Sequence, residues 1–188
     1  LRARGASVLL GDSPGGLYTA AHVNHVYDLS GMHACEAVGA ELNQDFSLAD
    51  ASFPDAVCAK KFTYTAYLDQ ADAIIDFCKL KTHGMMGMTN AVKNFFGIIP
   101  GAMKPEYHYK YPKIEDFANM IVDLCEYCKP RLCICDAVVG MEGNGPTQGS
   151  ARPIGCLLAA ENPHALDLVA CGLIGLQPDE VPTLTAAI

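Results

Sequence analysis

The sequence predicts an α/β protein whose mostly parallel sheet carries helices on both faces, as in a three-layer, Rossmann-like fold. Segments with the two-residue period of strands alternate with segments of helical period along the chain. The run 73–80 is mostly apolar, which is typical of a strand that is covered on both faces. Glycine-rich loops follow three of the predicted strands, and in open α/β sheets ligands bind beyond the carboxyl ends of the strands.

The predicted elements alternate from the start of the chain. We expect a strand at 6–11 and then a helical stretch over residues 20–40 that ends near Gly39. Residues 41–60 are irregular and acidic, with room for a short edge strand. The remaining elements are strands at 62–66, 73–80, 131–139 and 154–160, and helices at 89–97, at 114–128 and from Asn162, with Pro163 in the first helical position.

Length and composition limit the domain organisation. The chain has 188 residues, 51% of them hydrophobic and 18% charged, which suits a single α/β domain over residues 1–188. The opening residues LRARG match the last turn of a helix that Gly5 ends, so we expect a fragment of a longer chain that lacks an N-terminal strand and most of a helix. With no secretory signal and no apolar run of about 18–20 residues, the sequence predicts a cytoplasmic protein without a membrane partner.

Charge is distributed unevenly along the chain. Residues 79–113 contain six lysines against one glutamate, a balance of +5, and because the whole chain carries −8 the other residues total −13. A concentrated positive region usually attracts an anion. The acidic total argues against a nucleic acid as partner. We therefore expect a small anionic ligand, while the oligomeric state stays open.

The three glycine-rich loops, at residues 12–16, 82–90 and 140–146, form the candidate ligand site. Glycine lets the backbone approach a ligand closely, and free N–H groups can hold a phosphate. None of the loops contains a Walker A or a GxGxxG motif, so no named nucleotide-binding motif is present. Lys79 and Lys81 lie at the end of the strand before the second loop, and the alternative for them is a charged strand end that extends into water. The predicted ligand-binding residues are Asp12, Lys79, Lys81, Asn94, Asp136, Gly143, Asn144 and Gly145.

Two residues of the positive region are candidate catalytic groups. His83 begins the second loop, and histidine titrates near neutral pH and commonly transfers protons. Lys93 has apolar neighbours that favour loss of its proton, so it is a candidate nucleophile or attachment point. The alternatives are a surface histidine without a role and a lysine whose stem covers apolar surface. His108 is either a metal ligand or a histidine used in packing.

Nine cysteines allow two interpretations. Cys125, Cys128, Cys133 and Cys135 lie close together in the sequence, as zinc or iron–sulfur ligands do. The first two also follow the buried face of the predicted helix 114–128, and the last two alternate with apolar residues of a predicted strand. We favour packing, so an iron–sulfur cluster is not expected in this chain. A transition metal and a nucleotide-derived cofactor remain the candidate cofactors.

Three ordered motifs resemble a known family. The segments KLKTHGMMGMTNAVKNFFGIIPG, CDAVVGMEGNGPTQG and NPHALDLVACGLIGL are similar to those of the domain-of-unknown-function family 362. The likeness extends from GASVLLGDSP to the last predicted helix. The family's name implies no activity. Many members carry the ferredoxin motif C-x2-C-x2-C-x3-C-P, which this chain lacks, so the resemblance implies no cluster here.

A second resemblance concerns the spacing of a few residues. In the lactate racemase family a histidine is followed ten residues later by a lysine, then by Pro-Gly and a further histidine, and His83, Lys93 and His108 are spaced similarly. In that family the lysine carries a nickel-pincer nucleotide, the first histidine exchanges a proton or hydride, and the last coordinates nickel. This chain has NAV where that family has a doubled glycine before the lysine. The resemblance therefore implies a shared anion or nucleotide site rather than the attached cofactor.

Three functions are compatible with these observations. The first is a racemase-like, isomerase-like or redox enzyme, in which the lysines neutralise a small organic acid or a phosphorylated ligand and His83 moves a proton. The second is an iron–sulfur-associated electron-transfer protein. The third is a non-catalytic module that binds a metabolite through the same lysines. Whether the protein is an enzyme is open at this point.

Overall fold

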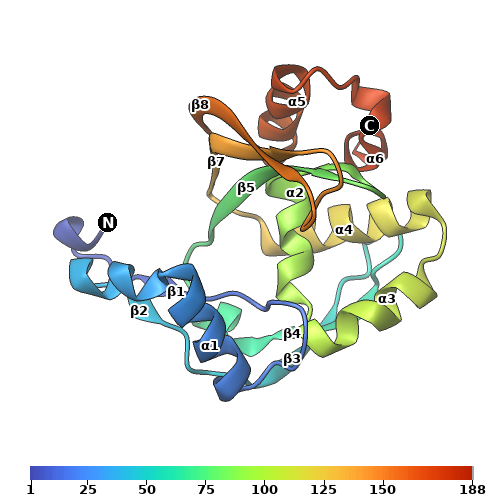
Figure 1. The fold of residues 1–188 in the computed structure, drawn as a ribbon. Coiled ribbons are helices and arrows are strands. Elements are labelled where there is room, and N and C mark those ends of the chain that lie inside the picture. Colours follow the sequence, from blue (N-terminus) through green and yellow to red (C-terminus); the bar gives the residue numbers. More distant parts are fainter. Residues whose placement is uncertain (188) are drawn as a thin grey trace. The chain divides into compact units, whose positions relative to one another are not determined.

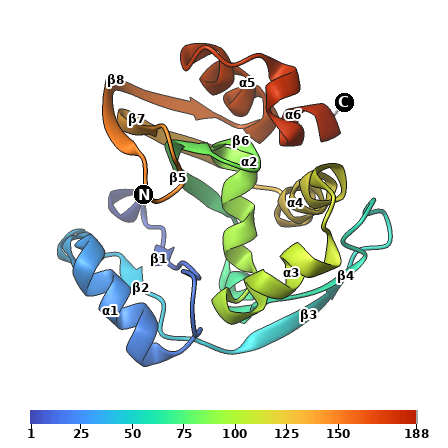
Figure 2. The same ribbon diagram turned by 45° about the vertical axis from the view of Figure 1, so that its right-hand side comes forward.

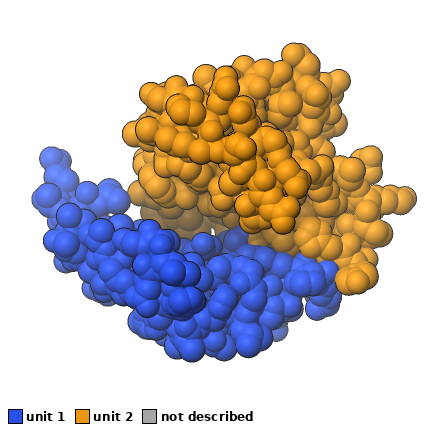
Figure 3. All heavy atoms as spheres, viewed as in Figure 1, with its two compact units in different colours: residues 1–52, 61–72, 97–107 blue, residues 53–60, 73–96, 108–188 orange. Residues whose placement is uncertain are grey.

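The computed structural model describes residues 1–187. The chain divides into two compact units (Figure 3). Unit 1 comprises Leu1–Ser52, Lys61–Asp72 and Gly97–Tyr107, and unit 2 comprises Phe53–Lys60, Ala73–Phe96 and the chain from His108 onward. The two units are described separately.

Unit 1 combines a short parallel pair of strands with a hairpin. β1 pairs in parallel with β2 through a helical connection, and β3 pairs with β4 in antiparallel fashion (Figure 1). Its core contains Val23, Tyr27 and Leu42. The elements are β1 (Leu9–Leu10), α1 (Ala20–Ser30), β2 (Glu41–Leu42), β3 (Leu48–Ser52), β4 (Lys61–Thr65), 3-10 helices at Arg2–Arg4, Met32–Val38, Ala66–Gln70 and Gly101–Met103, and the start of α3 (Lys104–Lys110), which continues into unit 2.

The helical stretch expected over residues 20–40 is present but interrupted. α1 ends because Gly31 adopts a left-handed conformation with φ of 72°, which an α-helix cannot continue through. The chain continues as a 3-10 helix over Met32–Val38, and Gly39, with φ of 88°, ends it at the predicted position.

Unit 2 is built on a four-stranded sheet with the strand order β6-β5-β7-β8. β5 and β7 are parallel and are connected through α4, whereas β6 and β8 each pair in antiparallel fashion with their neighbours. The elements are β5 (Ile75–His83), β6 (Gly87–Thr89), α2 (Ala91–Asn94), a 3-10 helix at Phe95–Ile98 that continues into unit 1, α4 (Ile114–Cys128), β7 (Leu132–Glu142), β8 (Ser150–Ala160), α5 (Pro163–Leu173), a 3-10 helix at Pro178–Glu180 and α6 (Pro182–Ala186).

The fold is therefore mixed α/β, and the predicted mostly parallel, three-layer arrangement is not confirmed. A parallel connection needs about a dozen residues or more, usually including a helix. Only three residues join β5 to β6 and seven join β7 to β8, so both connections are hairpins. The sequence pattern identified β5, β7 and β8 but not β6, and it did not establish the strand directions.

One face of this sheet carries the core of unit 2. The buried side chains of Cys78, Leu80, Cys133 and Cys135 point to the same face and pack with α5 and α6. Helices α5 and α6 contact each other, and α5 contacts β7 and β8 (Figure 2). On the opposite face, Phe77 is 67% exposed. The helices on both faces that a three-layer fold requires are thus not confirmed.

No helix within residues 1–187 is long and apolar enough to cross a membrane.

Candidate functional site

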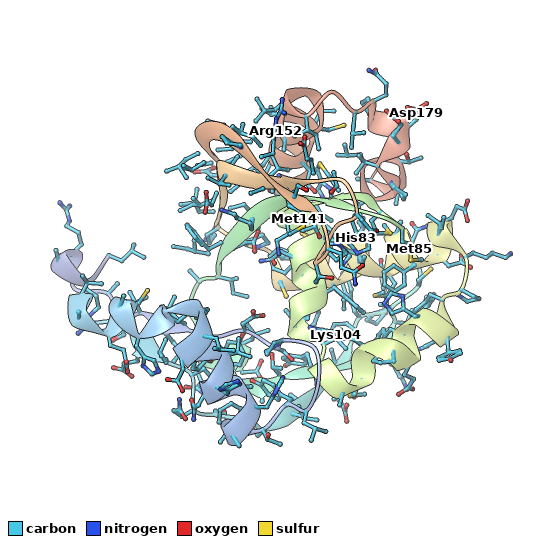
Figure 4. The ribbon with its side chains drawn as sticks, viewed as in Figure 1. His83, Met85, Lys104, Met141, Arg152 and Asp179 are labelled. Atoms are coloured by element: carbon cyan, nitrogen blue, oxygen red, sulfur yellow. The ribbon has the colours of Figure 1, made fainter. Side chains whose placement is uncertain are left out.

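His83 ends β5 and is held by the turn that follows it (Figure 4). The backbone N–H groups of Met85 and Met86 both donate to its Nδ1, each at 3.2 Å. Because Nδ1 accepts these hydrogen bonds, the neutral ring carries its hydrogen on Nε2. Burial, together with the positive charges of Lys93 and His108, lowers the pKa of His83 to about 4. At neutral pH His83 is therefore uncharged and presents Nε2–H as a donor.

Lys93 and His108 lie around the same aromatic ring. The Lys93 ammonium is 5.0 Å from the centroid of the Phe96 ring, a cation–π distance. The His108 ring meets Phe96 edge-on, with centroids 5.8 Å apart, and stacks on Phe117 at 4.5 Å. Partial burial lowers the pKa of His108, and the charge of Lys93 adds to this effect. Lys93 and His108 thus share the Phe96 ring, and the charges of both act on His83.

Lys79 and Asp136, both predicted ligand-binding residues, contact each other. The Lys79 ammonium donates to Asp136 Oδ2 at 2.7 Å across the parallel pair β5 and β7. This bond, together with one from the Val138 N–H, holds the pKa of Asp136 below its usual range. Lys81 lies beyond an irregularity in the ladder, opposite Met141 and Thr89.

The loop after β7 packs against the end of β5. A Cβ atom on Gly145 would lie 2.0 Å from the carbonyl oxygen of Thr82, so only glycine fits this close approach. Thr82 Oγ1 donates to the Gly143 carbonyl at 3.0 Å, and the Asn144 amide donates to Gln148 Oε1 at 3.2 Å. The third glycine-rich loop is therefore next to the strand end that carries His83.

Two predicted ligand-binding residues lie elsewhere. The Asn94 amide donates to Asp76 Oδ1 at 2.6 Å. Asp12 belongs to unit 1, where its carboxylate opposes the effect of burial on the pKa of Lys104, which burial lowers. The Lys104 ammonium donates to the carbonyl oxygen of Ser13.

Two buried carboxylates were not among the predicted site residues. Asp76 on β5 and Asp167 on α5 are 6% and 1% exposed. Burial raises the pKa of Asp76 to about 6 and that of Asp167 to about 7. A signal was present for Asp76, since a charged residue inside an otherwise apolar strand needs a partner. For Asp167 the sequence indicated only a carboxylate on a helix that could be buried.

The four clustered cysteines occupy packed positions. Cys125, Cys133 and Cys135 are buried, and Cys133 and Cys135 belong to the core below the sheet. Burial raises the pKa of Cys128 and of Cys133 to about 12. Within residues 1–187, no three His, Cys, Asp or Glu side chains are placed to hold a metal ion. A metal role for His108 stays a prediction.

Comparison with known proteins confirms the family resemblance. The model of the family described as Domain of unknown function (DUF362) matches residues 1–172. The chain is similar to the Thylakoid-associated protein sll1697 of Synechocystis sp. (strain ATCC 27184 / PCC 6803 / Kazusa), with 39% identity over 117 residues. This match covers 62% of the chain and 36% of the relative's length, so the chain spans little more than a third of that relative. No solved structure matches the chain.

Proposed function

We propose that this protein, which belongs to the DUF362 family, binds a small carboxylate or phosphate at the carboxyl end of β5 through His83 and Lys93. The observation that supports this most directly is the state of His83. Its Nδ1 is occupied by two backbone donors, so its Nε2–H is left to donate to a ligand oxygen.

The charge of the site favours an anion. Lys93 supplies a positive charge over the Phe96 ring, which His108 also contacts, and this charge adds to burial in lowering the pKa of both histidines. A lysine beside a neutral imidazole donor matches a ligand with two or more negatively charged oxygens. Residues 79–113, which include all three side chains, have a balance of +5 in an acidic chain.

The same geometry limits the chemistry assigned to His83. A neutral imidazole with an Nε2–H can polarise a carbonyl or stabilise charge that develops on an oxygen. It is a poor base, because its Nδ1 already accepts two hydrogen bonds and Nε2 carries the hydrogen. The isomerase-like reaction that the lactate racemase resemblance implies would therefore need a different base. We limit the proposal to binding and polarisation of the anion.

Calorimetric titration of the protein with inorganic phosphate and, separately, with L-lactate at pH 7 and low salt tests the proposal. We expect binding of at least one of the two, and the pair distinguishes phosphate from carboxylate recognition. Lys93→Met should weaken that binding by about tenfold or more, equivalent to roughly 1.4 kcal/mol. Lys60→Met removes an exposed lysine that is distant from Lys93 in the sequence, and it should leave the affinity unchanged. Equal affinities of Lys93→Met and the unaltered protein would show that the anion is not held at Lys93.

A further inference from the structure

The short segment 90–94 is tied to the core of unit 2 at several points. The Cys78 thiol donates to Asn90 Oδ1 at 3.1 Å. The next two backbone N–H groups, of Ala91 and Val92, donate to the Asp167 carboxylate. These contacts, with the one that Asn94 makes to Asp76, leave Lys93 as the residue of the segment that extends toward Phe96.

Asp167 acts as the N-terminal cap of α2, although it is 76 positions away from Ala91 in the chain. Its Oδ1 accepts from Ala91 N at 2.9 Å and its Oδ2 from Val92 N at 3.3 Å. Helices have unsatisfied N–H groups at this end, and a local side chain usually caps them. Asn90 occupies the cap position but makes no such bond. A helix of four residues is not stable alone, so the cap from α5 determines where α2 begins.

Asp76 holds the other end of α2. Its Oδ1 accepts from the Asn94 amide at 2.6 Å, and its Oδ2 accepts no hydrogen bond from residues 1–187. A buried carboxylate with only half of its acceptors used is costly for the fold. Asp167 uses both of its oxygens and Asp76 only one, yet both buried carboxylates are directed at the same turn of helix, which is hard to explain by stability alone.

We propose that Asp167 and Asp76 are positioning residues that hold α2 so that the Lys93 ammonium stays over the Phe96 ring, where its charge acts on His83. The two carboxylates bind opposite ends of the turn and lie on different elements, α5 and β5. Lys93, between their attachment points, is thereby fixed in position relative to the sheet. The use of this position for anion binding rests on the proposed function, whereas the positioning itself can be measured without a ligand.

The groups that face Asp167 are acidic or weakly acidic. Asp76 on β5 interacts with it unfavourably and adds to the effect of burial on its pKa. Burial and, at Cys78, a hydrogen bond with Cys135 raise the pKa of neighbouring thiols, and the charge of Asp167 adds to this; these thiols belong to Cys78 on β5, Cys125 on α4, Cys133 on β7 and Cys171 on α5. The charges that add to the effect of burial on the His83 pKa are those of Lys93 and His108, so removing the Asp167 charge should act on His83 through the position of Lys93.

A double-mutant cycle with the pKa of His83 as its readout tests the positioning role. Nuclear magnetic resonance would follow the His83 ring in the unaltered protein, Asp167→Asn, Lys93→Met and the double variant over a pH range of about 3 to 8. Asparagine keeps one acceptor but places a donor where the second N–H of α2 needs an acceptor. We expect the His83 pKa to rise by about half a unit or more in each single variant. In the Lys93→Met background, Asp167→Asn should add no further rise.

Two results would overturn the proposal. One is an unchanged His83 pKa in Asp167→Asn, and the other is the same increment from Asp167→Asn with and without Lys93. If Asp167→Asn does not fold, Asn94→Ala replaces it, because Asn94 is exposed and its loss frees the other end of α2. If the cycle shows coupling but phosphate and lactate do not bind, positioning stands and the proposed function fails.

Discussion

At the scale of single residues, Gly145 shows how a residue without a side chain shapes the site. Its backbone lies against the Thr82 carbonyl, where a Cβ atom would be 2.0 Å from the oxygen. This contact joins the loop after β7 to the end of β5, next to His83. The sequence predicted Gly145 as a ligand-binding residue from its place in a glycine-rich loop, and the structure gives it a packing role there.

Gly145→Ala should destabilise the protein by about 3 kcal/mol, because backbone atoms rather than a flexible side chain must move to admit the methyl group. Urea denaturation measures the change. Gly84→Ala is the matched control, since Gly84 is exposed and a Cβ atom there meets nothing within 4 Å. A loss of stability as large in Gly84→Ala would mean that the Thr82 contact is not responsible.

The sequence identified the candidate site residues but not their hydrogen-bonding states. The positive balance of residues 79–113 and the ten-residue spacing singled out His83 and Lys93, and the charge of Lys93 adds to burial in lowering the pKa of His83. The hydrogen-bonding state of His83 could not be predicted, because it depends on two backbone N–H groups of a turn. The contact between Lys79 and Asp136 depends on the register of β5 and β7, which no local pattern specifies.

At the scale of elements, α4 supports a loop far from it in the sequence. Asp123 is 5% exposed, and its carboxylate accepts from the backbone N–H groups of Val57, Cys58 and Ala59 at 2.7–2.9 Å. A carboxylate that accepts three backbone bonds organises an otherwise irregular loop. The sequence predicted the buried face of α4 from its apolar spacing but could not identify this partner.

Asp123→Ala should reduce the free energy of unfolding by about 2–4 kcal/mol, because three buried or half-buried donors lose a charged acceptor together. Thermal or urea denaturation would show it. Asp55→Ala, at an exposed position of the same loop, should change stability by less than about 0.5 kcal/mol. Similar losses in both variants would contradict the role of Asp123.

Helix boundaries were predicted well where local residues determine them. α5 begins after Asn162, whose Oδ1 accepts from Ala165 N at 3.0 Å, with Pro163 in the first position as expected. By contrast, α2 is shorter than the predicted helix 89–97, because a 3-10 helix follows Asn94. Its cap comes from Asp167 on another element, and such a long-range cap leaves no local signal.

At the scale of the whole molecule, stability should depend on pH through two groups whose contributions change with pH in opposite directions. The pKa of His83 is lowered from 6.5 to about 4, so the unfolded chain binds more protons between these values. The stability linked to His83 is therefore lost as pH falls from about 6.5 to about 4. The pKa of Asp76 is raised from 3.8 to about 6, so the folded protein retains a proton that the unfolded chain releases. The stability linked to Asp76 is lost as pH rises through that interval.

Urea denaturation between pH 4 and pH 7 would separate the two contributions. In His83→Asn, the new Oδ1 can accept the same backbone bonds. The free energy of unfolding of this variant should therefore decrease less than that of the unaltered protein as pH falls. Asp76→Asn, which keeps an acceptor for Asn94, should gain relative stability as pH rises. Curves that stay parallel to that of the unaltered protein would show that neither group titrates differently on folding.

The arrangement of the sheet was the least predictable feature of the chain. Strand periodicity located β5, β7 and β8 closely, because one buried face is enough to produce it. Strand direction depends on the length of the connections, and seven residues between β7 and β8 admit only a hairpin. The apolar run of β5 predicted a strand that helices cover on both faces, but its Phe77 side chain is largely exposed.

The nitrogen-15 spectrum of the His83 ring at pH 7, recorded with and without inorganic phosphate or L-lactate, tests the central claim most directly. We predict a neutral ring with its hydrogen on Nε2, and an Nε2 signal that shifts on titration with at least one of the two anions. The shift should be lost or much reduced in Lys93→Met. A charged ring at pH 7, hydrogen on Nδ1, or an Nε2 signal unmoved by either anion would contradict the assignment of His83 and Lys93 as an anion site.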